Sequence, residues 1–224
     1  MTKQIVVEFW GPYACFAPPW ARVDRVSMDM PTPSICRGML SAIYSKPEEF
    51  YWQIDKIEML QKPGYMNVKR NELKNKLSDR LNPIDTELVR TQRNTMLLTN
   101  VRYRVTAHMV LRSGFNKPPI ALYEQAVRRI KKGQCYYQPS FGTREYVAFF
   151  ELSDGTREPV DICEDFGIMP YDPWDFTSMN KEPRLSAFHC VMEGGTIIVP
   201  AYDSVDVIKT PVGKVGDVDA ESAV

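Results

Sequence analysis

Residues 95–111 constrain the fold more than any other segment, because polar and apolar side chains alternate there over a long run. A period of two residues is typical of a β-strand that turns one face toward a core. The segment therefore predicts a long strand and a sheet around it. The apolar side chains of the alternation are Val101, Tyr103, Val105 and Ala107, and the polar ones are Arg102, Arg104, Thr106 and His108.

Two helices and several further strands are predicted around this strand. Thr32 is a favoured N-cap residue and Pro33 a favoured first helical residue, so a helix should begin there and end before Pro47. A second helix should begin at Pro119 and end before Gly133, which suits the residue after a helix. The helix faces expected to be buried carry Ile35, Met39, Ala42 and Ile43 in the first and Ile120, Tyr123, Val127 and Ile130 in the second. Strands are predicted at 4–9, 51–60, 65–68 and 146–152.

The order β-α-β-β-α-β predicts an α+β fold with a ferredoxin-like (RRM-like) domain over residues 1–154. Residues 69–93 interrupt this order. They lack hydrophobic periodicity and carry Lys or Arg at seven positions. We therefore expect them to form a long basic loop or an extended hairpin arm.

The C-terminal part differs in character, being acidic and rich in proline and aromatic residues. Its clear strand signals lie at 187–192 and 196–199, on either side of a glycine-containing turn. A small antiparallel β domain is accordingly expected over residues 155–209. Residues 210–224 predict a flexible tail.

The charge of the chain is unevenly distributed, although 28 Lys and Arg balance 28 Asp and Glu. Residues 62–144 hold 17 basic and 5 acidic side chains, whereas residues 145–224 hold 5 basic and 16 acidic ones. Such a split indicates a nucleic-acid surface on the basic part and a solvated or partner-facing surface on the acidic part. The charges could also intermix once the chain folds.

Several kinds of function are disfavoured by missing sequence signals. The chain has two histidines and five cysteines without a CxxC pair, so neither a metal centre nor a disulfide framework is expected. Hydrolase, nucleotide-binding and dinucleotide-binding motifs are absent. No apolar run is long enough to span a membrane. We expect a cytoplasmic protein without metal, cofactor or membrane partner.

The loop GQCYYQPSFG, residues 133–142, is a candidate RNA contact. Tyr136 and Tyr137 could stack on bases, and Arg144 could meet a phosphate. The same loop could instead be a plain connection whose aromatic rings cover the edge of the sheet.

A basic cluster at the end of the second predicted helix is a further candidate. Its four cations could contact RNA, but cations at this end also offset the helix dipole, so the cluster alone is weak evidence. The cluster consists of Arg128, Arg129, Lys131 and Lys132, and Arg70 in the basic segment is an additional candidate.

Several stretches together resemble the CRISPR-associated proteins of the fifth Cas family in their type I-C (Dvulg) form, members of the RAMP superfamily. The matching stretches are WGPYACFAPP (10–19), PTPSICRGMLSAIYSKP (31–47), NVKRNE (67–72), RNTMLLTNVRYRVTAH (93–108), RRIKKGQCYYQPSFGTREY (128–146) and AFHCVMEGG (187–195). They cover most of residues 1–200 in the family's order, and the GQC…QP…G.RE block is the most specific.

The resemblance implies a ferredoxin-like domain with a small β domain after it. It also implies a metal-independent endoribonuclease that cuts CRISPR precursor transcripts within each repeat. The implied partners are the repeat or guide RNA, whose 5′ handle the protein retains, and the other Cas subunits of the type I-C surveillance complex.

The resemblance further implies a catalytic set at the helix ends. Tyr44 matches the family's tyrosine and Lys117 its lysine, but the position of the family's histidine is Pro118 here. Proline carries no proton and donates no hydrogen bond. Three outcomes follow: a slower enzyme that uses Tyr44 and Lys117, a relocated base, or a subunit that binds guide RNA without cutting it. The ring of Tyr44 could also simply pack inside the fold, and a ferredoxin-like protein that binds another protein through its acidic part is a third kind of function.

Overall fold

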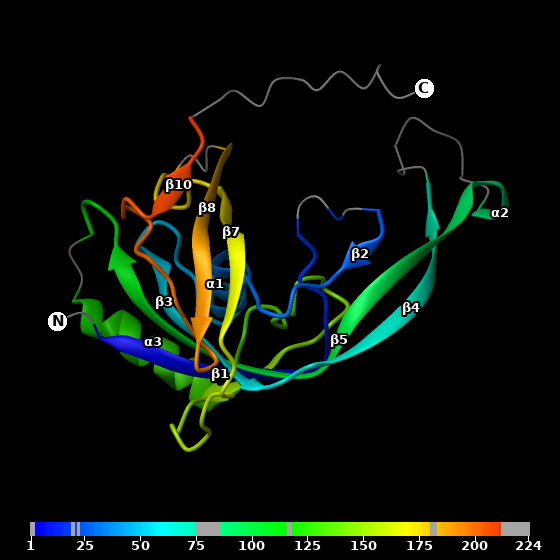
Figure 1. Ribbon diagram of the computed structural model, residues 1–224. Helices are drawn as coiled ribbons and strands as arrows, with labels where there is room; N and C mark the ends of the chain where they lie inside the picture. The colour runs from blue at the N-terminus through cyan, green and yellow to red at the C-terminus, as the bar shows by residue number, and fades with distance from the viewer. Residues whose placement is uncertain are drawn as a thin grey trace.

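The computed structural model describes residues 3–18, 21, 23–74, 86–115, 118–179 and 183–211. These residues form a mixed α/β protein in which one large, mostly antiparallel sheet dominates (Figure 1). The main path through the sheet is β10-β8-β9-β3-β5-β1-β6, while β2 and β4 pair with β5 and β7 pairs with β8.

Four antiparallel strands form the centre of the sheet, in the order β6-β1-β5-β3. They are β1 (Gln4–Ala14), β3 (Phe50–Gln61), β5 (Arg90–Leu111) and β6 (Phe149–Leu152). Helix α1 (Pro33–Ile43) lies between β1 and β3 in the chain, and α3 (Pro119–Lys131) between β5 and β6. The apolar side chains predicted to alternate along β5 are all buried, which confirms the expected core face.

Local signals fix the ends of both helices. The Thr32 side chain accepts a hydrogen bond from the Ile35 N–H (3.3 Å), and Pro33 is the first residue of α1, as expected. The helix ends at its cap Tyr44, before Pro47 is reached. After α3, Gly133 has φ +63°, the left-handed conformation that glycine tolerates best.

The buried face of α3 agrees with the expected one except at its start. Ile130 is buried, and Tyr123 and Val127 are half-buried against the core, whereas Ile120 is exposed. Leu122 and Ala126 are also buried, so the face is wider than expected.

A long hairpin arm extends the sheet to one side (Figure 1). It is built by β4 (Gly64–Leu73), whose register with β5 runs from Gly64↔Thr99 to Leu73↔Arg90. The two-residue strand β2 (Arg25–Val26) also pairs with β5. The four-residue helix α2 (Thr86–Val89) directly precedes β5 in the chain. The expected basic segment is therefore a hairpin arm where it is described; residues 75–85 lie outside the described part.

The C-terminal strands continue the same sheet. They are β7 (Glu164–Trp174), β8 (Pro183–Glu193), β9 (Thr196–Ile198) and β10 (Val207–Lys209). β9 pairs with β3 and so joins them to the centre. The strands β8 and β9 were expected, whereas β2, β7 and β10 were not. The division at residues 154 and 155 stays a prediction, and most of the expected tail, residues 212–224, lies outside the described residues.

A buried ionic network ties three central strands together. Glu8 on β1 is fully buried and accepts hydrogen bonds from Arg102 (2.9 Å), Arg104 (3.3 Å) and Arg157 (3.0 Å). Arg104 also reaches Glu58 on β3 (3.4 Å). Burial opposes ionisation of Glu8, but hydrogen bonds from Ser153, Arg102 and Arg104 outweigh it and lower the pKa of Glu8. The network thus depends on an ionised Glu8.

Replacing Glu8 by glutamine should lower the free energy of unfolding at pH 7 by about 3 kcal/mol, because three arginines lose the buried carboxylate that they share. The half-exposed Glu151, which also pairs with Arg102 (3.2 Å), provides the control; Glu151→Gln should cost less than about 1 kcal/mol. Since the pKa of Glu8 is lower folded than unfolded, its contribution is present above about pH 5 and is lost as pH falls further. Denaturant unfolding at pH 7 and pH 4 measures both effects, and equal losses in the two variants would contradict this role.

Candidate nucleic-acid interface

The C-terminal ends of α1 and α3 are clamped together by the loop that follows α3. Arg129 donates from Nε to the Ile43 carbonyl (2.8 Å), and the Tyr136 N–H donates to the Ala42 carbonyl (2.8 Å). The Arg129 guanidinium lies 4.4 Å from the centre of the Tyr136 ring. Arg129 thus has a structural role, which distinguishes it from the other cations of the predicted cluster.

The predicted aromatic contacts are available to a ligand. Tyr136 and Tyr137 are 60% and 61% exposed. The same loop is anchored at its other end, where Phe141 is buried and the Cys15 N–H donates to its carbonyl (3.1 Å). Gly142 (φ +84°) is required there, since a Cβ would lie 1.8 Å from the Cys15 carbonyl oxygen. The loop therefore presents two aromatic rings from a fixed base.

Tyr44 lies next to this clamp but inside the fold. Its side chain is 2% exposed, its ring centre lies 5.6 Å from that of Phe50, and its carbonyl accepts from Trp52 Nε1 (2.9 Å). Burial raises the pKa of the Tyr44 hydroxyl, against the opposing charge of Lys46. At neutral pH Tyr44 is thus protonated, so it can donate a proton but is poorly suited to accept one.

The other half of the predicted catalytic pair is not placed. Lys117 lies outside the described residues, so its distance from Tyr44 is not defined. Pro118 is the N-cap residue of α3 and provides no side-chain hydrogen bond to the helix. Lys46 is a cation close to Tyr44 in sequence, and it pairs with Glu49 (3.0 Å).

The remaining predicted cations fall into two groups. Arg128, Lys131 and Lys132 are exposed at the end of α3, and no ion pair links them to a carboxylate in the part of the chain that is described. Arg70 on the arm instead pairs with Glu145 (2.5 Å), beside the exposed Arg144. Arg70 is thus paired with the residue that directly follows Arg144 in the chain.

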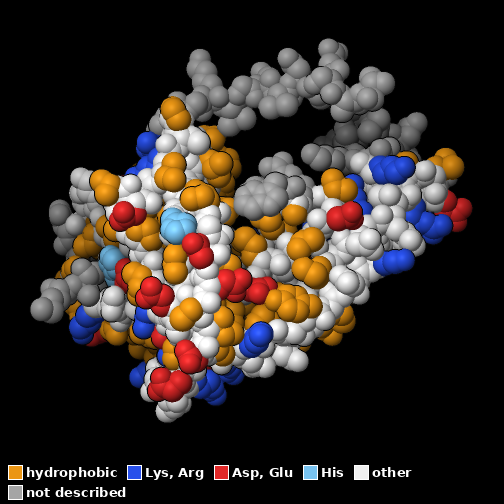
Figure 2. All heavy atoms as spheres, viewed as in Figure 1, with side chains coloured by type: hydrophobic (Ala, Val, Ile, Leu, Met, Phe, Trp, Pro, Cys, Tyr) orange, Lys and Arg blue, Asp and Glu red, His pale blue; other side chains and the backbone are white. Residues whose placement is uncertain are grey.

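The basic excess of residues 62–144 does not form one continuous surface. Arg102 and Arg104 form ion pairs with the buried Glu8, and Arg93 pairs with Glu72 (3.2 Å). Blue side chains lie along the arm together with some red ones, and red side chains gather over β7, β8 and the loop before them, with blue ones close by (Figure 2). The charges therefore intermix on the arm and among the C-terminal strands as well as in the core of the sheet.

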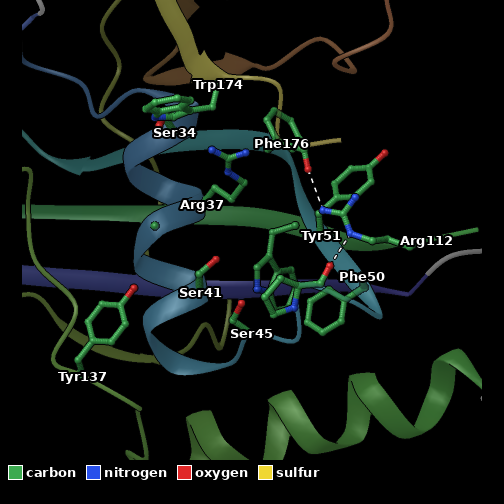
Figure 3. Close-up of a pocket in the computed structure, with 13 residues that line it drawn as sticks. Ser34, Arg37, Ser41, Ser45, Phe50, Tyr51, Arg112, Tyr137, Trp174 and Phe176 are labelled. Atoms are coloured by element: carbon green, nitrogen blue, oxygen red, sulfur yellow. Dashed lines mark hydrogen bonds between the residues drawn. The ribbon is translucent and has the colours of Figure 1, made fainter. Parts of the chain in front are cut away.

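The sequence did not reveal a groove along the exposed face of α1 (Figure 3). Its volume is about 650 Å³. We call it the α1 groove; it is lined by Ser34, Arg37, Gly38, Ser41, Ser45, Pro47, Phe50, Tyr51, Trp52, Arg112, Tyr137, Trp174 and Phe176. The spacing of small residues at 34, 38, 41 and 45 was a signal of an open helix face, but the opposite wall comes from distant segments.

No group of three or more His, Cys, Asp or Glu side chains within the described ranges is arranged to hold a metal ion. None of the described helices is long and apolar enough to cross a membrane.

Comparison with known proteins identifies the family. A family model described as CRISPR-associated protein (Cas_Cas5), for the Cas5d group, matches residues 4–206. A protein of Thermus thermophilus named CRISPR pre-crRNA endoribonuclease Cas5d is 40% identical over 169 residues, covering 75% of this chain and 72% of the relative. One of the same name from Mannheimia succiniciproducens is 37% identical over 224 residues, covering 90% and 97%.

Solved structures agree at the level of the fold. A crystal structure of a CRISPR-associated protein superposes with a TM-score of 0.69 at 21% identity, covering 94% of this chain and 97% of its own. A functionally uncharacterized protein from Streptococcus mutans gives 0.66 at 19% identity, covering 92% and 97%. The chain belongs to the Cas5 family of CRISPR-associated proteins, in its type I-C form, Cas5d.

Proposed function

We propose that this protein is an endoribonuclease that cuts CRISPR precursor RNA within each repeat, without a metal ion. It then retains the 5′ handle of the guide RNA as a cytoplasmic subunit of the type I-C surveillance complex. The observation that carries this function is the 37% identity along 90% of the chain to a relative named as a pre-crRNA endoribonuclease. The exposed aromatic loop and the exposed cations at the end of α3 supply the surface that RNA binding needs.

We also propose that the centre of the sheet is a ferredoxin-like unit. The order β6-β1-β5-β3, all antiparallel, with one helix after the first strand and one before the last, supports this assignment. Residues 155–209 would then be a separate β unit that continues its sheet through β9.

The proposed reaction is an attack of a ribose 2′-oxygen on the adjacent phosphorus. The bond from phosphorus to the 5′-oxygen breaks, which leaves a 2′,3′-cyclic phosphate on one product and a 5′-hydroxyl on the other. The 2′-hydroxyl gives its proton to a base, and the 5′-oxygen takes up a proton. Tyr44, with its raised pKa, suits the second transfer, and Lys117 would stabilise the charge on the phosphorane.

A second candidate function is that of a guide-RNA scaffold without cleavage. It is favoured by Pro118, which stands where the family's histidine would supply a proton-transfer group. The burial of Tyr44 points the same way, because a side chain that is 2% exposed contacts RNA only after a local rearrangement.

Purified protein mixed with its cognate repeat RNA in EDTA should give one discrete cut with a cyclic-phosphate end. Tyr44→Phe and Lys117→Ala should each slow single-turnover cleavage by about 100-fold or more, as expected for loss of a group that transfers a proton or stabilises charge. Repeat binding should change little in either variant. Gel analysis of end-labelled RNA measures all three results.

Pro118→His distinguishes the two candidate functions. Cleavage that rises in this variant would show that the histidine position matters for the enzyme. Binding without any cut, in wild type and in all three variants at any protein excess, would leave the scaffold function and remove the enzyme.

Neutralising Arg128, Lys131 and Lys132 to alanine should weaken repeat binding and flatten its dependence on salt. Three lost phosphate contacts predict a drop of about 2 in the slope of log affinity against log salt. Arg129 stays unchanged because its loss would open the clamp at Ile43. The control removes Lys56, Arg184 and Lys209, each already paired with a carboxylate. An unchanged slope in the first variant would mean that the cluster only caps α3.

A further inference from the structure

The α1 groove has the chemistry of a nucleotide site. Its lining includes Arg37 and Arg112 but no Asp or Glu. Arg37 forms an ion pair with the buried Asp172. Its guanidinium carbon lies 3.8 Å from the centre of the Phe176 ring. Arg112 donates only to backbone carbonyls among the described residues, including those of Phe176 (2.9 Å) and Thr177 (2.6 Å). Arg112 thus forms no direct ion pair with a carboxylate in the described part of the chain, although Asp175 and Asp203 act on the neighbouring Tyr51. A guanidinium outside an ion pair can attract an anionic occupant.

Its walls offer aromatic surface. Trp174, at the N-terminal end of α1, is 47% exposed, and Tyr137 stands at the other side of the helix (Figure 3). The helix face between them carries the small residues Gly38 and Ser41, and a Cβ at Gly38 would meet nothing within 4 Å, which leaves room for a bulky group. Flat exposed rings beside an open floor suit stacking of unpaired bases.

The groove is continuous with the proposed RNA surface. Tyr137 belongs both to the groove and to the loop of residues 133–142, and Ser45 directly follows Tyr44. A volume of about 650 Å³ lies within the range of roughly 300–1,000 Å³ that is usual for small-ligand sites.

We propose that the α1 groove holds unpaired nucleotides of the repeat RNA, with a base stacked on Trp174 and a phosphate at Arg112. This inference rests on the proposed function and adds to it a recognition site for a single-stranded segment. The site lies beside Tyr44, so it would position the strand that runs to the cleavage point.

Gly38→Trp tests the groove by filling it. A Cβ at Gly38 meets nothing within 4 Å, so the helix and core accept a side chain there. The full-length variant should bind its cognate repeat RNA about 10-fold or more weakly, measured by fluorescence anisotropy. Ile198→Trp adds the same bulk at an exposed position on β9, opposite Lys56 in the sheet, and should bind like wild type.

Trp174 supplies a second, independent readout. Trp174→Ala should weaken binding about 10-fold, whereas Trp174→Phe should retain most of the affinity because a ring remains for stacking. Bound RNA should quench tryptophan fluorescence in wild type, and Trp174→Phe should lose that quenching while it still binds. If thermal unfolding shows that Gly38→Trp has a lower Tm than wild type, the Trp174 variants test whether the groove holds RNA.

Failure of the inference and failure of the proposed function give different results. If wild type binds and cuts repeat RNA but Gly38→Trp and Trp174→Ala bind as tightly as wild type, the groove does not hold RNA. If those variants bind RNA normally but no longer assemble with the other subunits of the complex, the groove is a protein-docking site and the inference is overturned. If wild type itself binds no repeat RNA, the proposed function fails.

Discussion

The backbone groups of a strand must all find partners, and β5, at 22 residues, finds them in four other strands. Its C-terminal half lies between β1 and β3 in the core, and its N-terminal half pairs with β4 and β2 in the arm. One continuous strand therefore joins the arm to the layer that carries the helices. The pair between Arg70 and Glu145 then links the arm to the loop after α3. The arm and the layer that carries the proposed RNA surface are therefore parts of one sheet.

The elements that sequence reasoning predicted are those with strong local signals. Alternation marked β5, and the cap at Thr32 and the glycine at 133 marked helix ends. The sequence did not predict β7, because its pairing with β8 is irregular: register shifts near Gly167 and Pro170 interrupt the alternation of polar and apolar side chains. β2 and β10 are too short for any periodic pattern. The predicted face of α3 was wrong only at Ile120, which is apolar but left uncovered at the start of the helix.

The candidate site divides in the same way. The exposure of Tyr136 and Tyr137 could be predicted from a loop rich in polar residues and glycine, and it is confirmed. The structural role of Arg129 could not be predicted, since its hydrogen bond to the Ile43 carbonyl joins residues that are 86 apart in the chain. The α1 groove is harder still to predict: its wall combines α1, Arg112 and the segment after β7, which only the folded sheet brings together. Tyr44, matched through the family resemblance, turns out to be buried, which assigns it a protonated hydroxyl rather than a base.

The proposed function requires a single RNA strand to lie along the ends of α1 and α3. Ultraviolet cross-linking of the complete protein to its repeat RNA, followed by mass spectrometry of the linked peptides, would locate that strand. We expect cross-links at Tyr136, Tyr137 and Trp174, the exposed aromatic side chains of that surface. Cross-links confined to the acidic face around Asp165 and His189 would contradict it.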